Sequence, residues 1–344
     1  MNRDRIAVLV MTTTTLLAVT VLGPVATSGA SLSSPTTQAA AENPQRTVTS
    51  SQKRSAFAGH RPGRIYLGMS CGVECPKRES HLRANVGLKR WFKQWGNWNG
   101  VAEAIKEDRR KNRRTWISIE GPRGGAPSGW LAVAQGDFDR QIRDLARVLK
   151  RQDRQPIFLS FDHEMSNKAS ESQASWWARG FNRFHDVLKR AHALRRVALA
   201  PIHASWLFSK FNGGKSPAKW LPPGVLRRSS FVAVDVYQNW KGESFGNRIQ
   251  RVDRWLGRHG HPGMKIAVGE TGATNGLGGD TAASWLNQSL HWAAKNRRKM
   301  VAISYFNSRA NSASNVYWPL DESARKVDVY RTWLKKDVYI NRVS

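Results

Sequence analysis

The chain is poor in acidic residues and in cysteine. Its 344 residues include 25 Asp and Glu against 55 Lys and Arg, which gives a formal net charge of +30. The two cysteines are Cys71 and Cys75. A structural zinc site needs about four ligands, and no nearby residues supply the others, so we expect no metal and no cofactor. The pair predicts either a small disulfide-closed loop or two free thiols.

Two common catalytic signatures are also missing. The segment His163-Glu164-Met165-Ser166-Asn167 lacks the second histidine of a zinc-protease helix. The stretch Gly213-Gly214-Lys215-Ser216 is not a phosphate-binding loop, because Ser209 stands where the first glycine is required.

Long apolar runs are absent after the N-terminus. Arg3 and Arg5 precede a mostly apolar stretch from Ile6 to Val25, which predicts a secretory signal peptide over residues 1–30. An uncleaved membrane anchor is the alternative, because the stretch approaches spanning length. Residues 31–62 are rich in Ser, Thr, Ala, Gln and Pro, which predicts a flexible linker before a catalytic domain at 63–344. We therefore expect an extracellular or envelope-associated monomer, free of the membrane after cleavage.

The positive charge concerns partners more than fold. Nucleic acid is the default partner of so basic a protein, but export favours anionic cell-wall polymers instead. The basic runs at residues 109–114 and 295–299 precede strand-like segments, so we expect them at helix C-terminal ends, where cations are favoured. We expect solvated faces and no specific nucleic-acid groove.

From Arg64 onward, short apolar runs alternate with longer amphipathic ones. Such alternation predicts a parallel sheet with helical crossovers, and the number of units favours an α/β fold of the (β/α)8 TIM-barrel type. The expected helices are Phe138–Arg151, Ser175–Leu194, Asn247–His259 and Thr281–Asn296. The expected strands are Ile65–Ser70, Leu88–Trp95 (the weakest), Thr115–Glu120, Ile157–Phe161, Val197–Ile202, Phe231–Tyr237, Lys265–Gly269 and Val301–Phe306.

Glu164 closes the apolar run that begins at Pro156, and Glu270 closes the run that begins at Lys265. An ionised carboxylate is costly to desolvate, so two such endings suggest carboxylates that face one cleft, as in glycoside hydrolysis. TIM-barrel enzymes place their catalytic groups at the C-terminal strand ends. Tyr237 and Tyr305 could instead be core aromatics, and an isolated His203 is more often a buried histidine. Further polar and aromatic residues expected near these ends are Ser70, Glu120, Trp206, Asp235 and Asn307.

The segment Ser160-Phe161-Asp162-His163-Glu164-Met165, with Trp176-Trp177 downstream, resembles the acid/base region of glycoside hydrolase family 26. Val268-Gly269-Glu270-Thr271-Gly272 resembles its nucleophile region, and the run from Phe231 to Tyr237 resembles its sixth strand. The resemblance implies a retaining TIM-barrel glycosidase with Glu164 as acid/base on strand four and Glu270 as nucleophile on strand seven. One departure is Ser160, where the family commonly has an arginine.

The resemblance implies a secreted β-glycanase that acts on a mannan-like polysaccharide, with carboxyl groups about 5–5.5 Å apart. Loss of turnover would leave the alternative, an envelope polysaccharide- or polyanion-binding protein on the same scaffold. Tryptophans that follow strand runs are candidates for stacking on sugar rings. The expected substrate-binding residues are His163, Tyr237, His203, Trp206, Trp240, Tyr305 and Trp318.

Overall fold

The computed structural model describes residues 57–151, 155–238, 242–309 and 318–343. The predicted signal peptide, most of the predicted linker and Trp240 lie outside these ranges. The described residues belong to one compact unit, Ser50–Ser344. Within the described part of the chain, no helix has the length and apolar character needed to cross a membrane.

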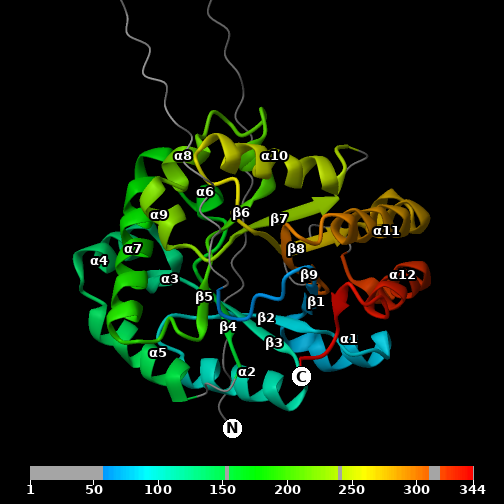
Figure 1. The fold of residues 1–344 in the computed structure, drawn as a ribbon, viewed down its shortest axis with the longest axis horizontal. Helices are drawn as coiled ribbons and strands as arrows, with labels where there is room; N and C mark the ends of the chain where they lie inside the picture. The colour runs from blue at the N-terminus through cyan, green and yellow to red at the C-terminus, as the bar shows by residue number, and fades with distance from the viewer. Residues whose placement is uncertain (1–56, 152–154, 239–241, 310–317, 344) are drawn as a thin grey trace, which may run out of the picture. The chain divides into compact units, whose positions relative to one another are not determined.

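A parallel sheet closes into a barrel at the centre of this unit (Figure 1). Its hydrogen-bonded order is β5-β4-β3-β2-β1-β9-β8-β7-β6, and β10 pairs with β1. Only Ala200 and Pro201 separate β5 from β6, so the two ends of the order form one interrupted barrel strand. The predicted (β/α)8 architecture is confirmed. The strands are β1 Ile65–Ser70, β2 Leu88–Lys93, β3 Arg114–Ile119, β4 Ile157–Phe161, β5 Val197–Leu199, β6 Ile202–Ala204, β7 Val232–Gln238, β8 Ile266–Ala273, β9 Met300–Phe306 and β10 Tyr339–Ile340.

Two strands differ from the sequence expectation. The fifth barrel strand is split, because Pro201 cannot donate a ladder hydrogen bond. Strand β8 continues to Ala273, so Glu270 lies inside a strand and does not end one. Side chains of a buried strand still alternate between its two faces, which is why a carboxylate inside β8 can face the barrel axis.

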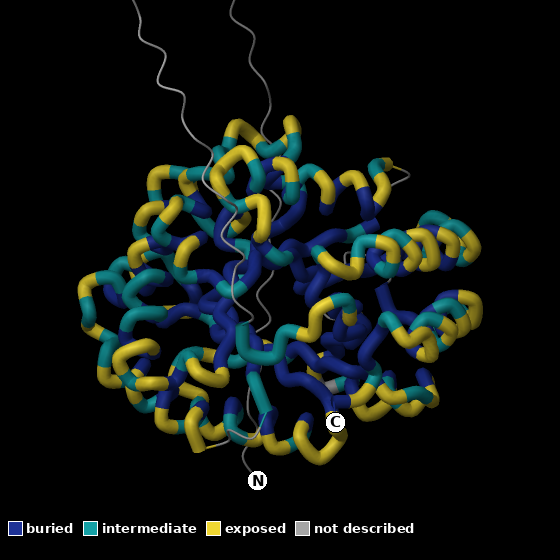
Figure 2. The backbone as a smooth tube through the Cα atoms, in the orientation of Figure 1, coloured by how far each residue is buried: buried dark blue, intermediate teal, exposed yellow. Residues whose placement is uncertain are grey.

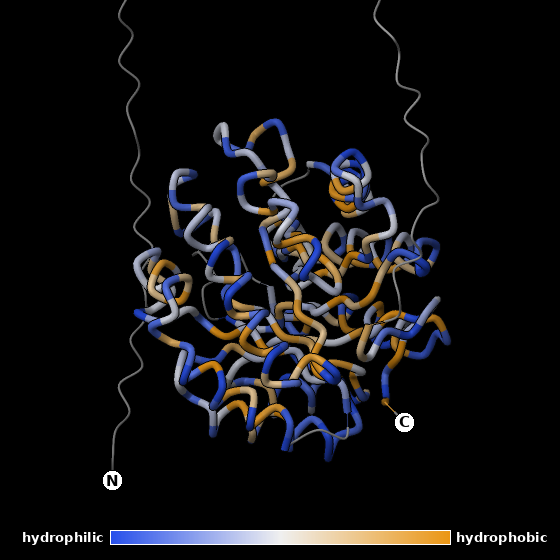
Figure 3. The backbone as a smooth tube through the Cα atoms, turned by 60° about the vertical axis from the view of Figure 1, so that its left-hand side comes forward, coloured by the Kyte–Doolittle hydropathy of each residue, from blue (hydrophilic) through white to orange (hydrophobic). Residues whose placement is uncertain are grey.

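Helices surround the barrel on its outer side (Figure 1). They are amphipathic: in α5, Ile142, Leu145, Ala146 and Leu149 are buried at helical spacing. Hydrophilic and hydrophobic residues alternate along the backbone in Figure 3. The longer helices are α1 Cys75–Leu82, α2 Trp98–Arg110, α4 Pro127–Gln135, α5 Asp139–Arg151, α7 Ala174–Arg190, α10 Phe245–Arg258, α11 Gly279–Lys295 and α12 Ala324–Leu334. The shorter ones are α3 Pro122–Gly125, α6 Met165–Lys168, α8 Pro217–Trp220 and α9 Pro223–Arg228, and the 3₁₀ turns are η1 Gly72–Glu74, η2 Glu171–Gln173, η3 Ser205–Phe208, η4 Asn275–Leu277 and η5 Leu320–Glu322.

Two apolar clusters fill the molecule (Figure 2). The larger lies between sheet and helices. The smaller contains Tyr66, Trp116, Phe158 and Phe231, which alternate along their strands with residues of the larger cluster, so it fills the barrel interior. The rings of Trp116, Phe158 and Phe231 meet edge to face. This packing leaves the C-terminal strand ends for polar side chains.

Cys71 and Cys75 form a disulfide at the end of β1. The bridge spans η1 and ties the end of β1 to the start of α1. Of the two alternatives that the sequence left open, the structure has the disulfide-closed loop.

Candidate active site

Glu270 lies on β8, beside Asp235 of the neighbouring strand β7. The register between the two strands shifts at this point, so Gly269 forms an irregularity just before Glu270. A Cβ at Gly269 would lie 2.6 Å from Asp235 Oδ1 and 3.1 Å from Arg90 Nη1. Glycine at this position therefore lets Asp235 and Arg90 approach the backbone of β8.

Two donors from different strands hold the Glu270 carboxylate. Arg90 Nη1 on β2 donates to Oε1 at 2.9 Å, and the Tyr237 hydroxyl on β7 donates to Oε2. Arg90 is fully buried, and its Nε donates to Ser118 Oγ on β3 at 3.1 Å. Hydrogen bonds to both oxygens, one from an arginine and one from a phenol, fix the orientation of this carboxylate.

Glu164 follows β4 in a turn with left-handed backbone. Asp162 has φ 61° and Glu164 has φ 50°, which is uncommon for residues other than glycine. Asp162 anchors the turn: its carboxylate accepts from Trp130 Nε1 at 2.8 Å, from Lys168 Nζ at 2.5 Å and from the His163 backbone N–H at 2.9 Å. Strained backbone of this kind persists where surrounding contacts over-determine it, and it concentrates at functional sites.

The environment of Glu164 favours its protonated form. Burial, followed by the negative charge of Glu270, raises the pKa of Glu164 to about 7. Opposing contributions come from the charge of Arg90 and from Asn167 Nδ2, which donates to Glu164 Oε2 at 3.1 Å. Two carboxyl groups, one inclined to hold a proton and the other hydrogen-bonded at both oxygens, can serve as proton donor and nucleophile in glycosyl transfer.

A third carboxylate, Asp235, is buried between these groups. Its Oδ1 lies 3.7 Å from Arg90 Nη1, and neither carboxylate oxygen has a hydrogen-bond partner among the described residues. Burial and the charge of Glu270 raise the pKa of Asp235 well above its usual range. When Asp235 is neutral, the positive charge of Arg90 pairs with Glu270 alone.

The rings of His163, which precedes Glu164, and Phe92 lie close together. Their ring centroids are 5.3 Å apart, and Phe92 is one of the few large apolar side chains on the described surface, with 38% of it exposed. Burial, then the charges of Lys168 and Arg90, lower the pKa of His163 well below its usual range. A neutral imidazole next to an exposed ring can meet a sugar through hydrogen bonds and stacking.

The structure places the other expected binding residues at various depths. Tyr237 contacts Trp318, with ring centroids 4.6 Å apart, and Trp318 also packs on Gly272. Trp206 is half-buried in η3, with Lys215 Nζ 5.8 Å from its ring centroid. Trp240 lies outside the described residues.

His203 and Tyr305, which were expected near the substrate, are fully buried. His203 lies between Trp177 and Trp220, and burial lowers its pKa to about 3. The Tyr305 hydroxyl donates to Trp318 O at 2.7 Å, and Lys326 Nζ donates to the same carbonyl at 3.1 Å. His203 therefore belongs to the packing between the sheet and its helices, and Tyr305 fixes the position of Trp318.

Sequence analysis missed Arg90, Phe92, Asp162 and Lys168. Arg90 and Phe92 lie on β2, the weakest predicted strand, where basic residues on both sides of Trp91 and Phe92 gave little strand signal. Asp162 stood in a motif that drew attention to its neighbour Glu164. An arginine inside a strand run was the available signal, because a buried arginine needs carboxylate partners.

Comparison with solved structures finds the same barrel fold. No family model matches the sequence, and neither does any curated protein. Among solved structures, the endo-β-1,4-mannanase of Cellulomonas fimi aligns with TM-score 0.56 and 13% identity over 81% of this chain and 72% of that one. A family 26 β-mannanase from Bacteroides ovatus aligns with TM-score 0.55 and 16% identity, over 80% and 90% of the two chains.

The likeness extends beyond family 26. An endo-β-1,4-glucanase from Xanthomonas axonopodis pv. citri aligns with TM-score 0.58 and 12% identity, over 78% of this chain and 98% of that one. At these identities the likeness concerns the glycosidase-barrel fold, and the substrate has to be argued from the site.

Proposed function

We propose that the chain is an exported retaining β-glycanase. The observation that carries the proposal is the difference between the environments of two interacting carboxyl groups. The pKa of Glu164 is raised to about 7, while Glu270 accepts hydrogen bonds from Arg90 and from the Tyr237 hydroxyl. Pairs of carboxyl groups whose environments differ in this way divide into proton donor and nucleophile in glycoside hydrolysis.

In the first step, a Glu270 oxygen attacks the anomeric carbon while the bond to the leaving oxygen breaks. Glu164 transfers its proton to that oxygen, so the leaving sugar departs as a neutral alcohol. The products of the step are a glycosyl ester on Glu270 and an ionised Glu164. Arg90 and Tyr237 fix the attacking carboxylate against rotation.

In the second step, ionised Glu164 takes a proton from a water molecule as the water oxygen attacks the anomeric carbon. The ester bond to Glu270 breaks, Glu270 leaves as a carboxylate, and Glu164 is protonated again. Two inversions at one carbon give net retention. The geometry required is a separation of about 5–5.5 Å between the two carboxyl groups.

We propose a mannan-like β-linked polysaccharide as the substrate. Support comes from the resemblance of the His163-Glu164 pair to family 26 and from the mannanases among the structural neighbours. The exposed Phe92 beside His163 supplies a flat ring, and Trp318 packs against Tyr237, whose hydroxyl donates to Glu270. Trp206 is a further candidate for stacking, and so is Trp240, which lies outside the described residues.

The test is a panel of β-mannan, β-xylan and mixed-linkage β-glucan, assayed for release of reducing sugar. We expect activity on β-mannan, and a loss on the order of 10⁴-fold in Glu270→Ala. Glu164→Ala should lose about 10²–10⁴-fold. Glu103→Ala, which removes an exposed carboxylate from α2, is the matched control and should keep full activity. Absence of activity on every polymer, or full activity in Glu270→Ala, contradicts the proposal.

A further inference from the structure

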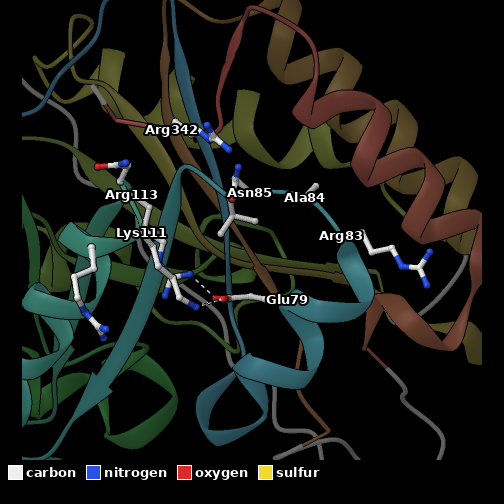
Figure 4. Close-up of a pocket in the computed structure, with 10 residues that line it drawn as sticks. Glu79, Arg83, Ala84, Asn85, Lys111, Arg113 and Arg342 are labelled. Carbon is white, nitrogen blue, oxygen red and sulfur yellow. Dashed lines mark hydrogen bonds and ion pairs between the residues drawn. The ribbon is translucent and has the colours of Figure 1, made fainter.

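Two basic cavities open at the end of the barrel opposite the catalytic carboxylates. The first has a volume of about 550 Å³ and is formed by the loops before β2 and β3 and by the chain end after β10 (Figure 4). The second, of about 580 Å³, is formed by the segments before β1, β8 and β9. All the strands are parallel, so segments that precede them lie at the N-terminal end of the barrel, away from Glu164 and Glu270.

The first cavity is lined by an ordered set of cations. Arg113 is buried and satisfied by Asp108 and Glu107, at 2.5 and 3.0 Å, and by Glu79. Lys111 Nζ lies 2.5 Å from Glu79 and completes that wall. Because these acids are already paired, they do not neutralise the other cations that line the cavity.

Three arginines of the first cavity have no acidic partner in the part of the chain that the structure describes. They are Arg83, Arg110 and Arg342, and all three are exposed. Asn85 orients one of them: in the amide orientation that satisfies both groups, its side-chain oxygen accepts from Arg342 Nε at 2.7 Å. An oriented guanidinium at a cavity wall can bind an oxyanion with two parallel hydrogen bonds.

The second cavity has no acidic residue in its lining. It is lined by His60, Pro62, Gly63, Arg64, Lys265, Arg297 and Arg298. Lys265 Nζ donates to Arg298 O at 2.8 Å, which fixes the lysine in the wall. Burial and the charge of Lys299 lower the pKa of Lys265, and burial with the charge of Lys265 lowers that of His60. Burial is the larger cause of both shifts, and the neighbouring positive charges add to it.

The two cavities are neighbours around the barrel. Strands β8, β9, β1, β2 and β3 are consecutive in the sheet, and β10 pairs with β1 between the two groups of loops. We define the basic end of the barrel by the unpaired or exposed cations of the two linings, Arg83, Arg110, Arg342, Arg64, Arg297 and Arg298.

We propose that the basic end of the barrel binds a flexible anionic glycan polymer, whose repeated phosphate or carboxylate groups enter the two cavities. Separate cavities suit charged groups that project from a flexible chain. Apart from the His60 imidazole, the linings hold no aromatic ring, whereas single-stranded nucleic acids are held largely by stacking on aromatic side chains. Bound in this way, the protein presents its opposite, carboxylate-bearing end to a neighbouring polymer.

The test compares two variants of the full chain that each lose four positive charges. One carries Arg83→Gln, Arg342→Gln, Arg297→Gln and Arg298→Gln at the basic end. The other carries Lys106→Gln, Arg143→Gln, Arg179→Gln and Arg254→Gln on exposed positions of α2, α5, α7 and α10. Binding to polygalacturonate, to poly(glycerol phosphate), to neutral mannan and to a single-stranded oligonucleotide of matched charge is measured over a range of salt concentrations.

We expect wild type to bind the two anionic glycan polymers and not neutral mannan, with affinity falling steeply as salt rises. The basic-end variant should bind at least about tenfold more weakly and with a shallower salt dependence, while the control variant stays within about twofold of wild type. Which glycan binds more tightly distinguishes phosphate from carboxylate as the recognised group.

Several results overturn the proposal. Equal losses in the two variants mean diffuse charge without a site, and no binding by wild type means no such ligand. Tighter binding of the oligonucleotide through the same four arginines means a nucleic-acid surface. The binding assay is independent of hydrolysis, so its outcome is separate from that of the glycanase proposal. Both variants should also keep the wild-type activity on any soluble neutral substrate.

Discussion

Arg90 on β2 and Glu270 on β8 form a buried ion pair, with Nη1 and Oε1 2.9 Å apart. Two strands, β1 and β9, separate them around the barrel, so the pair crosses its interior. Asp235 Oδ1 lies 3.7 Å from the same Nη1 atom. Arg90 is thus the one cation in contact with two buried carboxyl groups of the described site.

Removing Arg90 should destabilise the fold. Arg90→Met leaves a buried carboxylate without its cation, which costs about 3–5 kcal/mol in the free energy of unfolding. Urea unfolding followed by circular dichroism measures the change. Arg147→Met, which removes an exposed ion pair with Asp144, is the matched control and should cost less than about 1 kcal/mol.

Asp235→Asn tests whether Asp235 is neutral beside Arg90. An amide and a protonated carboxyl group carry no charge and have nearly the same size, so this change should cost less than about 1 kcal/mol in the free energy of unfolding. A cost of Asp235→Asn as large as that of Arg90→Met, or a cost of Arg90→Met as small as that of the control, contradicts the roles given to these two residues.

The activity should decline as pH rises through about 7. Glu164 has to be protonated to donate its proton, and its pKa is raised to about 7 by burial first and by Glu270 second. In Glu270→Gln the second cause is removed, so the pKa of Glu164 should fall but stay above its usual 4.5. Carbon-13 NMR of the labelled Glu164 carboxyl group measures this directly. An unchanged pKa in Glu270→Gln means that the two groups do not interact.

The same shift has a consequence for stability. The folded state holds the Glu164 proton up to about pH 7, while the unfolded state releases it near 4.5. The free energy of unfolding should therefore decrease across this interval, and Glu164→Gln should remove that part of the decrease.

Tyr237→Phe removes the hydroxyl that donates to Glu270 Oε2. The ring and its contact with Trp318 remain, so substrate binding and folding should change little. We expect kcat to fall by about 10²–10³-fold, the usual effect of losing one donor to a reacting oxygen, with KM nearly unchanged. Phe306→Leu, which alters another ring beside Tyr237 while the hydroxyl stays, is the control. A kcat within twofold of wild type in Tyr237→Phe contradicts the role of this hydroxyl.

The barrel and its two glutamates could be predicted from sequence because each depends on local pattern. Alternating strand and helix runs predict the architecture, and Glu164 and Glu270 follow apolar runs along the chain. Arg90 could not be assigned a role, because its partner is 180 residues away and only barrel closure brings them together. The depth of His203 also depends on Trp177 and Trp220, which come from helices outside the sheet.

Gly269→Ala should disrupt the site although it replaces no titratable residue. Its Cβ would lie 2.6 Å from Asp235 Oδ1, and the buried Asp235 has no space to withdraw. We expect loss of both stability and activity, typically about 1–3 kcal/mol in the free energy of unfolding. Gly257→Ala in α10 is the control: nothing lies within 4 Å of its Cβ, so the helix should gain up to about 1 kcal/mol. Equal behaviour of the two variants contradicts this account of the β8 irregularity.

The measurement that tests the central claim most directly is the anomeric configuration of the first product. Proton NMR during the first minutes of hydrolysis, before mutarotation, shows which anomer is released from the β-linked polymer that the panel identifies. If Glu164 is the acid/base and Glu270 the nucleophile, the β-anomer appears first, because two inversions give retention. Initial release of the α-anomer would mean a single displacement by water and would contradict the roles assigned to this pair.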